Sequence, residues 1–198
     1  MSKLKEMFLK NGKTVTYKSN DVIFNEHDIC KTVGYIIKGR VKISTFTGNE
    51  NEVTINLLNA NDIFGDLLVF SSNPYYYGIG ICLESTTINY ISKDKLISLL
   101  SSDSLFLTEF LNLITNKGVS LKQMNKLYAH KNIEERFTYY IYHIAKRIDE
   151  HKVYYKSVTD IAHILSIPRP SLSRTIHKME KEGKITISKN IIEIKIHP

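Results

Sequence analysis

The stretch VTDIAHILSIPRPSLSRTIHKMEKEGKI, residues 158–185, contains two short segments with helical periodicity. Apolar side chains recur at helical spacing in both: Ile161, Ala162 and Leu165, then Leu172, Ile176 and Met179. Ser166-Ile167-Pro168 interrupts the pattern, and Pro170 falls in a first helical turn, where proline is tolerated because its missing N–H would have no partner there. We therefore predict helices over 157–165 and 169–182, joined by a tight turn as in a helix-turn-helix.

The outer side of the second predicted helix is polar and basic. Once the apolar positions are buried, five side chains remain on or near the outer face of its N-terminal half: Arg169, Ser171, Ser173, Arg174 and His177. That end of a recognition helix meets base edges in the major groove, where an arginine can hold guanine O6 and N7 together. An ordinary solvated surface is the alternative for Arg174 or His177 taken alone. The combined pattern predicts DNA binding.

The segment after this helix, KITISKNIIEIKI (residues 184–196), predicts a β-hairpin with its tip at 187–191. We expect this hairpin to be the wing of a winged helix, with Lys189 near a phosphate. Residues 130–198 carry 13 Lys or Arg against 8 Asp or Glu, which is +5 of the whole chain's net +7. Such a basic excess in a small module is typical of a surface that binds a polyanion.

Two longer helices are predicted upstream. The first, over 104–131, has an apolar stripe that the sequence alone could assign to the chain's own β domain or to the same helix of a second subunit. We favour a homodimer, because one small β domain cannot easily cover so long a stripe. The predicted dimer seam comprises Phe110, Ile114, Leu121 and Met124. The second helix is predicted over 132–150, with Ile144, Ala145 and Ile148 on its apolar side, and a polar turn after it.

The N-terminal half changes to the pattern of short strands. From about residue 14 to residue 92, β-branched or aromatic runs of four to seven residues alternate with turn signals such as Lys38-Gly39. This pattern predicts an antiparallel β-roll or sandwich, followed by a helix over 92–103 with Ser92 as its N-cap. The predicted fold class is α+β, with a β-roll domain at 1–103, a connecting helix at 104–131 and a winged helix-turn-helix domain at 132–198.

Several classes of protein are excluded by composition. The two cysteines cannot supply a disulfide framework or an iron–sulfur cluster, and no apolar run is long enough to cross a bilayer. The N-terminal apolar stretch is too short for a signal peptide, so we expect a soluble, cytoplasmic protein without a membrane partner. We find no phosphate-binding glycine loop, closely spaced metal motif or nucleophile motif, and we expect neither enzymatic activity nor a bound cofactor or metal.

The helix-turn-helix segment resembles the Crp/Fnr (cyclic-AMP receptor protein-like) transcription regulators. Residues 158–185 are similar to the family signature T-x-x-D-I-A-x-x-L-G-x-S-R-x-(T/S)-(V/L)-S-R-x-(L/I)-x-x-L-E-x-x-G-x-I. The resemblance implies that Arg169 and Arg174 read bases and that Ser157, Ser171 and His177 contact phosphates. It also implies RNA polymerase as a partner. The sequence departs from the family at Pro170, where many members have a base-reading glutamate.

The β domain resembles the family's cyclic-nucleotide-binding roll over GYIIKGRVKISTFTGNENEVTINLLNANDIFGDLLVF, residues 34–70, with Gly39 and Gly65 at expected glycines. Members that bind cyclic AMP have Gly-Glu and, about ten residues on, Arg-Ser/Thr. Here Gly65-Asp66 is followed by Tyr76-Tyr77, so a buried phosphate would lack its arginine and we expect no binding of cyclic nucleotides.

Asp66, Tyr76 and Tyr77 are nevertheless candidates for contact with another small-molecule effector. The tyrosines could equally form a packed sheet edge, and the protein could have lost its ligand. His27 is a candidate haem ligand, although a histidine in such a polar loop is more often a surface residue.

The sequence as a whole therefore predicts a homodimeric, sequence-specific regulator that binds double-stranded DNA at a pseudo-palindrome. Its two recognition helices would enter successive major grooves about 34 Å apart. The alternative is a small-molecule-binding β-roll protein whose C-terminal module is a protein–protein adaptor. The basic outer face of the second helix favours DNA.

Overall fold

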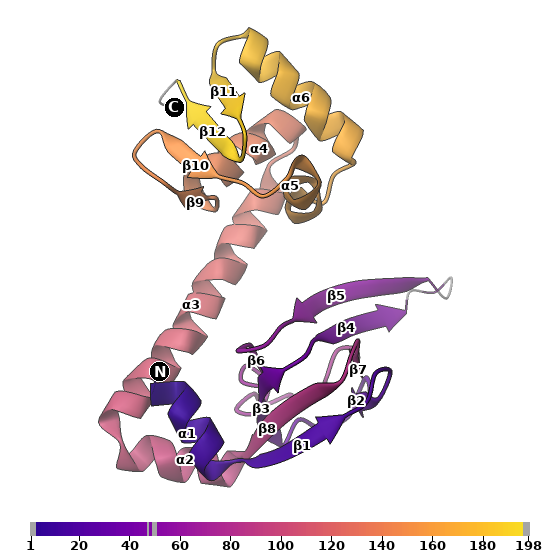
Figure 1. Cartoon of the computed structure of the whole chain (residues 1–198), viewed down its shortest axis with the longest axis vertical. Helices are drawn as coiled ribbons and strands as arrows, with labels where there is room; N and C mark the ends of the chain where they lie inside the picture. Colours follow the sequence, from indigo (N-terminus) through magenta and orange to yellow (C-terminus); the bar gives the residue numbers. More distant parts are fainter. Residues whose placement is uncertain (1–2, 47, 49–50, 196–198) are drawn as a thin grey trace. The chain divides into compact units, whose positions relative to one another are not determined.

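The computed structural model describes residues 3–46, 48 and 51–195 (Figure 1). The chain divides into two compact units, Met1–Thr115 and Asn116–Pro198, and the division falls inside helix α3 (Ser104–Ala129). No helix among the described residues is long and apolar enough to span a membrane.

The N-terminal unit contains two four-stranded antiparallel sheets with the orders β1-β8-β3-β6 and β2-β7-β4-β5. Their strands are β1 (Lys13–Tyr17), β2 (Val22–Phe24), β3 (Thr32–Lys38), β4 (Val41–Phe46), β5 (Glu52–Leu58), β6 (Ile63–Phe64), β7 (Ile79–Cys82) and β8 (Thr86–Ser92). Side chains of both sheets share one core, which includes Val33, Ile88 and Cys82. The short strands predicted between about residues 14 and 92 are confirmed, whereas the two-residue strand β6 was not predicted.

Two short helices accompany the sheets. Helix α1 (Lys3–Asn11) was not predicted; it buries Leu4 and Phe8, and the Phe8 ring lies 5.7 Å from that of Tyr35 on β3. This cover explains why four consecutive residues of β3 are buried. Helix α2 (Lys93–Ser102) begins as predicted, because the Ser92 hydroxyl accepts a hydrogen bond from the Lys95 N–H at 3.4 Å.

The predicted dimer seam on α3 needs a correction. Phe110 is buried in the N-terminal core, with its ring edge-on to that of Phe70, so a partner subunit cannot reach it. Ile114 is half-buried against the same core and Met124 against the C-terminal core, whereas Leu121 is exposed. The apolar positions of α3 are therefore partly covered by the chain's own cores and partly exposed. The large apolar side chains exposed on α3 are Leu105, Leu107, Leu111, Val119, Leu121 and Tyr128.

The C-terminal unit packs three helices against a four-stranded antiparallel sheet of order β11-β12-β10-β9. The elements are α4 (Ile133–His143), β9 (Lys146–Arg147), β10 (Lys152–Tyr154), α5 (Val158–Leu165), α6 (Arg169–Lys181), β11 (Ile185–Ser188) and β12 (Ile191–Ile194). Its core is apolar and includes Phe137, Leu165, Leu172 and Ile192. The helices predicted over 157–165 and 169–182 and the terminal hairpin are confirmed.

The helix predicted over 132–150 is too long. Helix α4 ends at His143, and the N–H groups of both Ile144 and Ala145 bond to the Tyr140 carbonyl. The chain then forms the β9–β10 hairpin, because Val153 is buried and pairs with Ile192 of the sheet. Ile148, predicted on the apolar side of the helix, is instead exposed.

The turn between α5 and α6 is tight. Ser166 adopts a left-handed conformation (φ 53°), which turns the chain so that the Ile167 N–H reaches the Ala162 carbonyl at 3.0 Å. Pro170 lies in the first turn of α6, as predicted, where the Pro168 carbonyl accepts from the N–H groups of Ser171 and Leu172.

Candidate nucleic-acid interface

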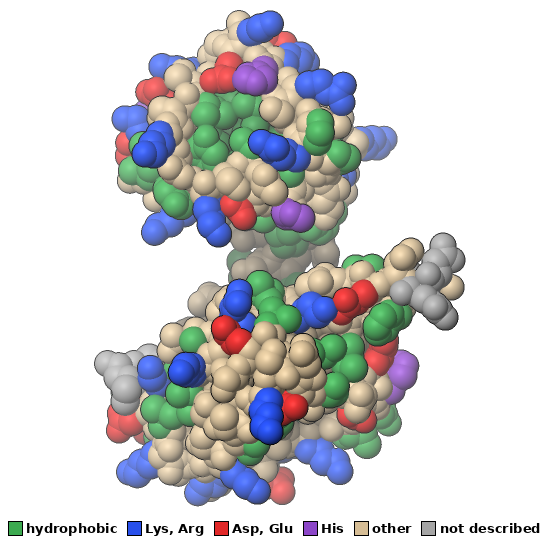
Figure 2. Space-filling view, turned by 45° about the vertical axis from the view of Figure 1, so that its right-hand side comes forward, with side chains coloured by type: hydrophobic (Ala, Val, Ile, Leu, Met, Phe, Trp, Pro, Cys, Tyr) green, Lys and Arg blue, Asp and Glu red, His purple; other side chains and the backbone are tan. Residues whose placement is uncertain are grey.

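The outer face of α6 is basic. Leu172, Ile176 and Met179 are buried on its inner side, and the exposed cationic or ionisable side chains of this helix are Arg169, Arg174, His177, Lys178 and Lys181. The first three were predicted from the sequence, and Lys181 extends the same face by one turn. Lys and Arg side chains are spread over the visible face of the C-terminal unit, around a central apolar area (Figure 2).

Within the described residues, Arg174 and His177 make their polar contacts with residues of their own helix. The Arg174 guanidinium lies over the first turn of α6, where Nε is 3.4 Å from the Pro170 carbonyl oxygen and Nη2 is 3.4 Å from the Ser171 hydroxyl. His177 Nδ1 is 3.4 Å from a Glu180 carboxylate oxygen, and the His177 side chain is 73% exposed. Because these contacts are long and exposed to water, either side chain can leave them for a ligand at little cost.

The three predicted serines occupy different positions. Ser157 is the N-cap of α5: its hydroxyl accepts the Asp160 N–H at 3.0 Å and donates to the Asp160 carboxylate. The Ser157 hydroxyl is therefore already hydrogen-bonded within α5, so the predicted contact with a phosphate would compete with these bonds. Ser171 and Ser173 lie half-buried on the two flanks of α6, and the Ser171 hydroxyl accepts from Arg174.

The tip of the β11–β12 hairpin is fixed beside the start of α5. Asn190, in a left-handed conformation (φ 63°), donates from Nδ2 to the carbonyls of Tyr155 and Lys156 at 3.1 and 3.0 Å. Its own carbonyl accepts the Tyr155 N–H. Lys189, predicted from the sequence, is therefore exposed at a tip held near the exposed Lys156. Lys156 was not predicted from the sequence as a phosphate-binding residue, although its position directly before the cap residue Ser157 could have indicated it.

Two lysines near α6 are already neutralised. Glu134, at the start of α4, bonds to Lys178 at 2.8 Å and to Lys184 at 2.6 Å, and Lys184 also bonds to Glu182 at 2.7 Å. Hydrogen bonds from Lys178 and then Lys184 hold the pKa of Glu134 below its ordinary range. The same pairing, with Glu134 and then Glu182, raises the pKa of Lys184 to about 12. These cations hold α4, α6 and the β11 entry together.

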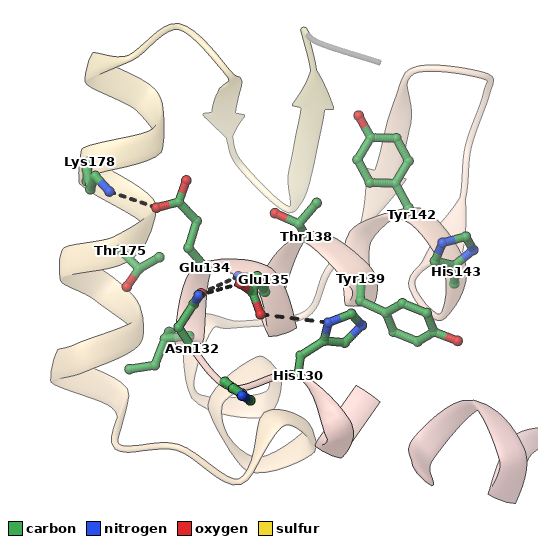
Figure 3. A pocket seen from close by; sticks show the side chains of 12 residues that line it. His130, Asn132, Glu134, Glu135, Thr138, Tyr139, Tyr142, His143, Thr175 and Lys178 are labelled. Atoms are coloured by element: carbon green, nitrogen blue, oxygen red, sulfur yellow. Dashed lines mark hydrogen bonds and ion pairs between the residues drawn. The ribbon is translucent and has the colours of Figure 1, made fainter. Parts of the chain in front are cut away.

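A groove of about 910 Å³ lies on the side of α6 that faces α4 (Figure 3). Glu134 points toward Lys178 at one end, and Glu135 points toward His130, with Oε2 4.0 Å from Nδ1. The His130, Tyr139 and His143 rings follow one another at centroid distances of 5.1 and 4.6 Å. The groove is bordered by Lys178 and Thr175 rather than by Arg174. It therefore lies beside the outer face of α6 and not on it.

The three predicted effector residues of the β unit do not converge on one cavity. Asp66 and Tyr76 are buried, whereas Tyr77 is 61% exposed. The Tyr76 ring stacks on that of Phe24 with centroids 3.8 Å apart, and burial raises the pKa of its phenol. Tyr76 thus fills the interior as a packed aromatic side chain.

Gly65, one of the glycines expected from the sequence, has φ +76°, and a Cβ there would lie 2.6 Å from the Thr32 carbonyl oxygen, so this position requires glycine.

An open pocket of about 590 Å³ lies next to Tyr76. His27, the candidate haem ligand, is exposed at its edge in a left-handed conformation (φ 69°), and Asp28, Lys31 and Tyr75 also line it. Within the described residues no three His, Cys, Asp or Glu side chains are grouped so that they could hold a metal ion.

Comparisons with known proteins agree with this architecture. Residues 14–103 match the family model of the cyclic nucleotide-binding domain. No curated protein sequence matches the chain.

Several solved structures share its fold. CprK in complex with OCPA is 16% identical over 98% of this chain and 91% of its own, with a TM-score of 0.67. The c-di-GMP responsive global regulator CLP from Xanthomonas campestris is 16% identical over 98% and 99%, with a TM-score of 0.57. FixK2 from Bradyrhizobium japonicum is 14% identical over 93% of each chain, with a TM-score of 0.54.

Residues 14–103 are therefore similar to cyclic nucleotide-binding domains, and the chain has the fold of solved Crp/Fnr-type transcription regulators. The resemblance seen in the sequence is confirmed at this level. At such identities the solved structures establish the fold alone.

Proposed function

We propose that this protein is a homodimeric transcription regulator of the Crp/Fnr type that binds specific double-stranded DNA through a winged helix-turn-helix at residues 132–198. The observation that supports this most directly is the outer face of α6, where Arg169, Arg174, His177 and Lys181 are exposed together. Helix α6 would enter the major groove, with Arg174 reading a base edge. Lys156 and Lys189 would contact phosphates near the α5 N-terminus.

Dimer formation would use the exposed apolar stripe of α3. Leu107, Leu111 and Leu121 are spaced by four and ten residues, which keeps them on one side of the helix, and each is exposed in the single chain. A stripe of this kind is typical of a helix that pairs with a second copy. Pairing through α3 would set the separation of the two α6 helices on a pseudo-palindromic operator.

We further propose that cyclic nucleotides are not the effector. Tyr76 stands where cyclic-AMP-binding members have an arginine, and its ring is packed on Phe24. A cyclic phosphate placed there would lose a charge-assisted pair and would have to displace a buried aromatic ring. A small molecule of another kind would have to bind elsewhere in this unit, and the open pocket beside His27 and Lys31 is a candidate place.

The alternative function is that of a protein–protein adaptor, in which we would expect α6 to be more apolar and less basic than it is here. Selection from a random pool of duplexes by the ligand-free protein, at a stated salt concentration, separates the two functions. We expect enrichment of an inverted repeat whose half-sites lie about one helical turn apart. Failure to enrich any sequence, with or without added cyclic AMP or cyclic GMP, would contradict the proposed function.

A further inference from the structure

The C-terminal end of α5 receives hydrogen bonds from two other helices. The last four carbonyl groups of an α-helix have no partner within the helix. In α5 the carbonyls of Ala162 and His163 accept the N–H groups of Ile167 and Ser166, both at 3.0 Å. The carbonyls of Ile164 and Leu165 are instead bonded by side chains from α3 and α4.

Tyr128, in the last turn of α3, donates its hydroxyl hydrogen to the Ile164 carbonyl at 3.1 Å. The Tyr128 hydroxyl oxygen also lies 3.5 Å from the hydroxyl oxygen of Ser166, in the turn that leads to α6. Tyr128 is 43% exposed, so its ring adds little to the packed core, whereas its hydroxyl is aimed at the helix-turn-helix. The adjacent Leu127, fully buried, provides the apolar packing of this part of α3.

Arg136 of α4 completes the connection. Its Nη1 donates to the Leu165 carbonyl and its Nη2 to the His130 carbonyl, where the chain has just left α3, both at 3.1 Å. The guanidinium also lies 5.9 Å from the centre of the Tyr128 ring. A cation at the C-terminal end of α5 interacts favourably with the helix dipole, and the planar fork reaches two carbonyls that a lysine could not hold together.

We propose that Tyr128 and Arg136 form a clasp that fixes the direction in which α3 leaves the helix-turn-helix. They are positioning residues: neither lies on the outer face of α6. In the proposed dimer the two α3 helices pair, so a fixed α3–α5 junction would determine the separation of the two α6 helices. The clasp would therefore determine which half-site spacing the protein accepts. This inference rests on the proposed function.

The test compares Tyr128→Phe with Tyr154→Phe in the full-length chain. Tyr154, on β10, is also 43% exposed and is not part of the clasp, so the two variants lose the same hydroxyl group at the same exposure. Binding is measured to the selected operator, to operators with one or two base pairs added between the half-sites, and to a single half-site. We expect the preference for the selected spacing to be about 3- to 10-fold lower in Tyr128→Phe than in Tyr154→Phe, which is the size of effect expected for the loss of one hydrogen bond.

The single half-site separates positioning from a general structural effect. If the clasp acts by positioning α3, Tyr128→Phe and Tyr154→Phe will bind the single half-site equally well and will have equal melting temperatures. Unchanged spacing preference, or an equal loss on all three kinds of duplex, would overturn the proposal. Arg136→Lys is the second variant: it retains the charge but not the fork, and we expect the same loss of spacing preference.

Hydrogen exchange keeps the test independent of the proposed function. If the wild-type protein selects no duplex, the proposed function fails, and the clasp is then judged from amide exchange across Ser166–Leu172. Faster exchange in Tyr128→Phe than in Tyr154→Phe would support the clasp. Equal exchange in the two variants would overturn it.

Discussion

The cations of α6 differ in what already neutralises them. Lys178 bonds to Glu134 on α4 at 2.8 Å, whereas the contacts of Arg174, four residues earlier, are within the described residues only the weak ones with Pro170 and Ser171 of its own helix. An exposed cation without a carboxylate partner gains most when it meets a phosphate or a guanine edge, because it gives up no ion pair. We therefore propose that Arg174, rather than Lys178, reads a base.

We expect Arg174→Ala to weaken binding to the selected operator by about 1–3 kcal/mol and to relax selectivity at one position of each half-site. Lys178→Ala is the matched control, since it removes a cation one turn away that is bonded to Glu134. The control should lower stability and leave operator selectivity unchanged. Repeated selection from the random pool measures the selectivity. An unaltered preference in Arg174→Ala would show that another side chain reads that position.

At the scale of elements, three segments far apart in sequence meet at Glu134. The start of α4, the middle of α6 and the entry to β11 are joined by Lys178 and Lys184 on this one carboxylate. Sequence patterns did not reveal this junction, because the paired residues are 44 and 50 positions apart and charge spacing along one helix does not report such contacts. The junction orients α6 in the C-terminal unit.

The junction predicts an acid-sensitive stability. The pKa of Glu134 is lowered from 4.5 in the folded state, chiefly by hydrogen bonds from Lys178 and Lys184. Its stabilising effect is thus present above pH 4.5 and is lost as pH falls through the lower folded-state pKa. Glu134→Gln removes this dependence. In thermal unfolding, the wild-type advantage over Glu134→Gln should shrink steadily from pH 6 to about pH 3; an advantage that stays constant over that range would contradict the assignment.

Most elements could be predicted from the sequence, because strands with β-branched residues and helices with regular apolar spacing have strong local signals. The α5–turn–α6 segment was predicted nearly to the residue, since prolines and apolar spacing agree there. The β9–β10 hairpin could not be predicted: its strands have two and three residues, and the pairing of β10 with β12 depends on the tertiary fold. Of the site residues, Arg169, Arg174 and His177 were found by helical periodicity, whereas Lys156 and the clasp of Tyr128 and Arg136 depend on contacts between elements.

At the scale of the whole molecule, α3 belongs to both compact units, with the division after Thr115. Its inner side enters both cores: Phe106 and Phe110 are buried in one and Leu127 in the other. The side that bears Leu107, Leu111 and Leu121 is exposed in the single chain. Phe110 and Leu121 are eleven residues apart, about three helical turns, so they lie on the same side of α3 and differ in whether a core covers that part of the helix. Helical spacing alone does not show that the N-terminal core covers Phe110, which is why Phe110 was placed in the predicted seam.

The corrected stripe makes a specific prediction for assembly. A charge at Leu121 would be buried between two paired helices without a partner, so Leu121→Glu should convert a dimer to a monomer and abolish binding to two half-sites. Asn112→Glu is the control: it introduces the same charge on exposed α3 surface, away from the Leu107–Leu111–Leu121 line. Light scattering at several concentrations gives the mass, and circular dichroism shows whether each variant folds. A folded Leu121→Glu variant that remains dimeric would place the subunit interface on another surface of the chain, and the spacing of the two α6 helices would then be set there.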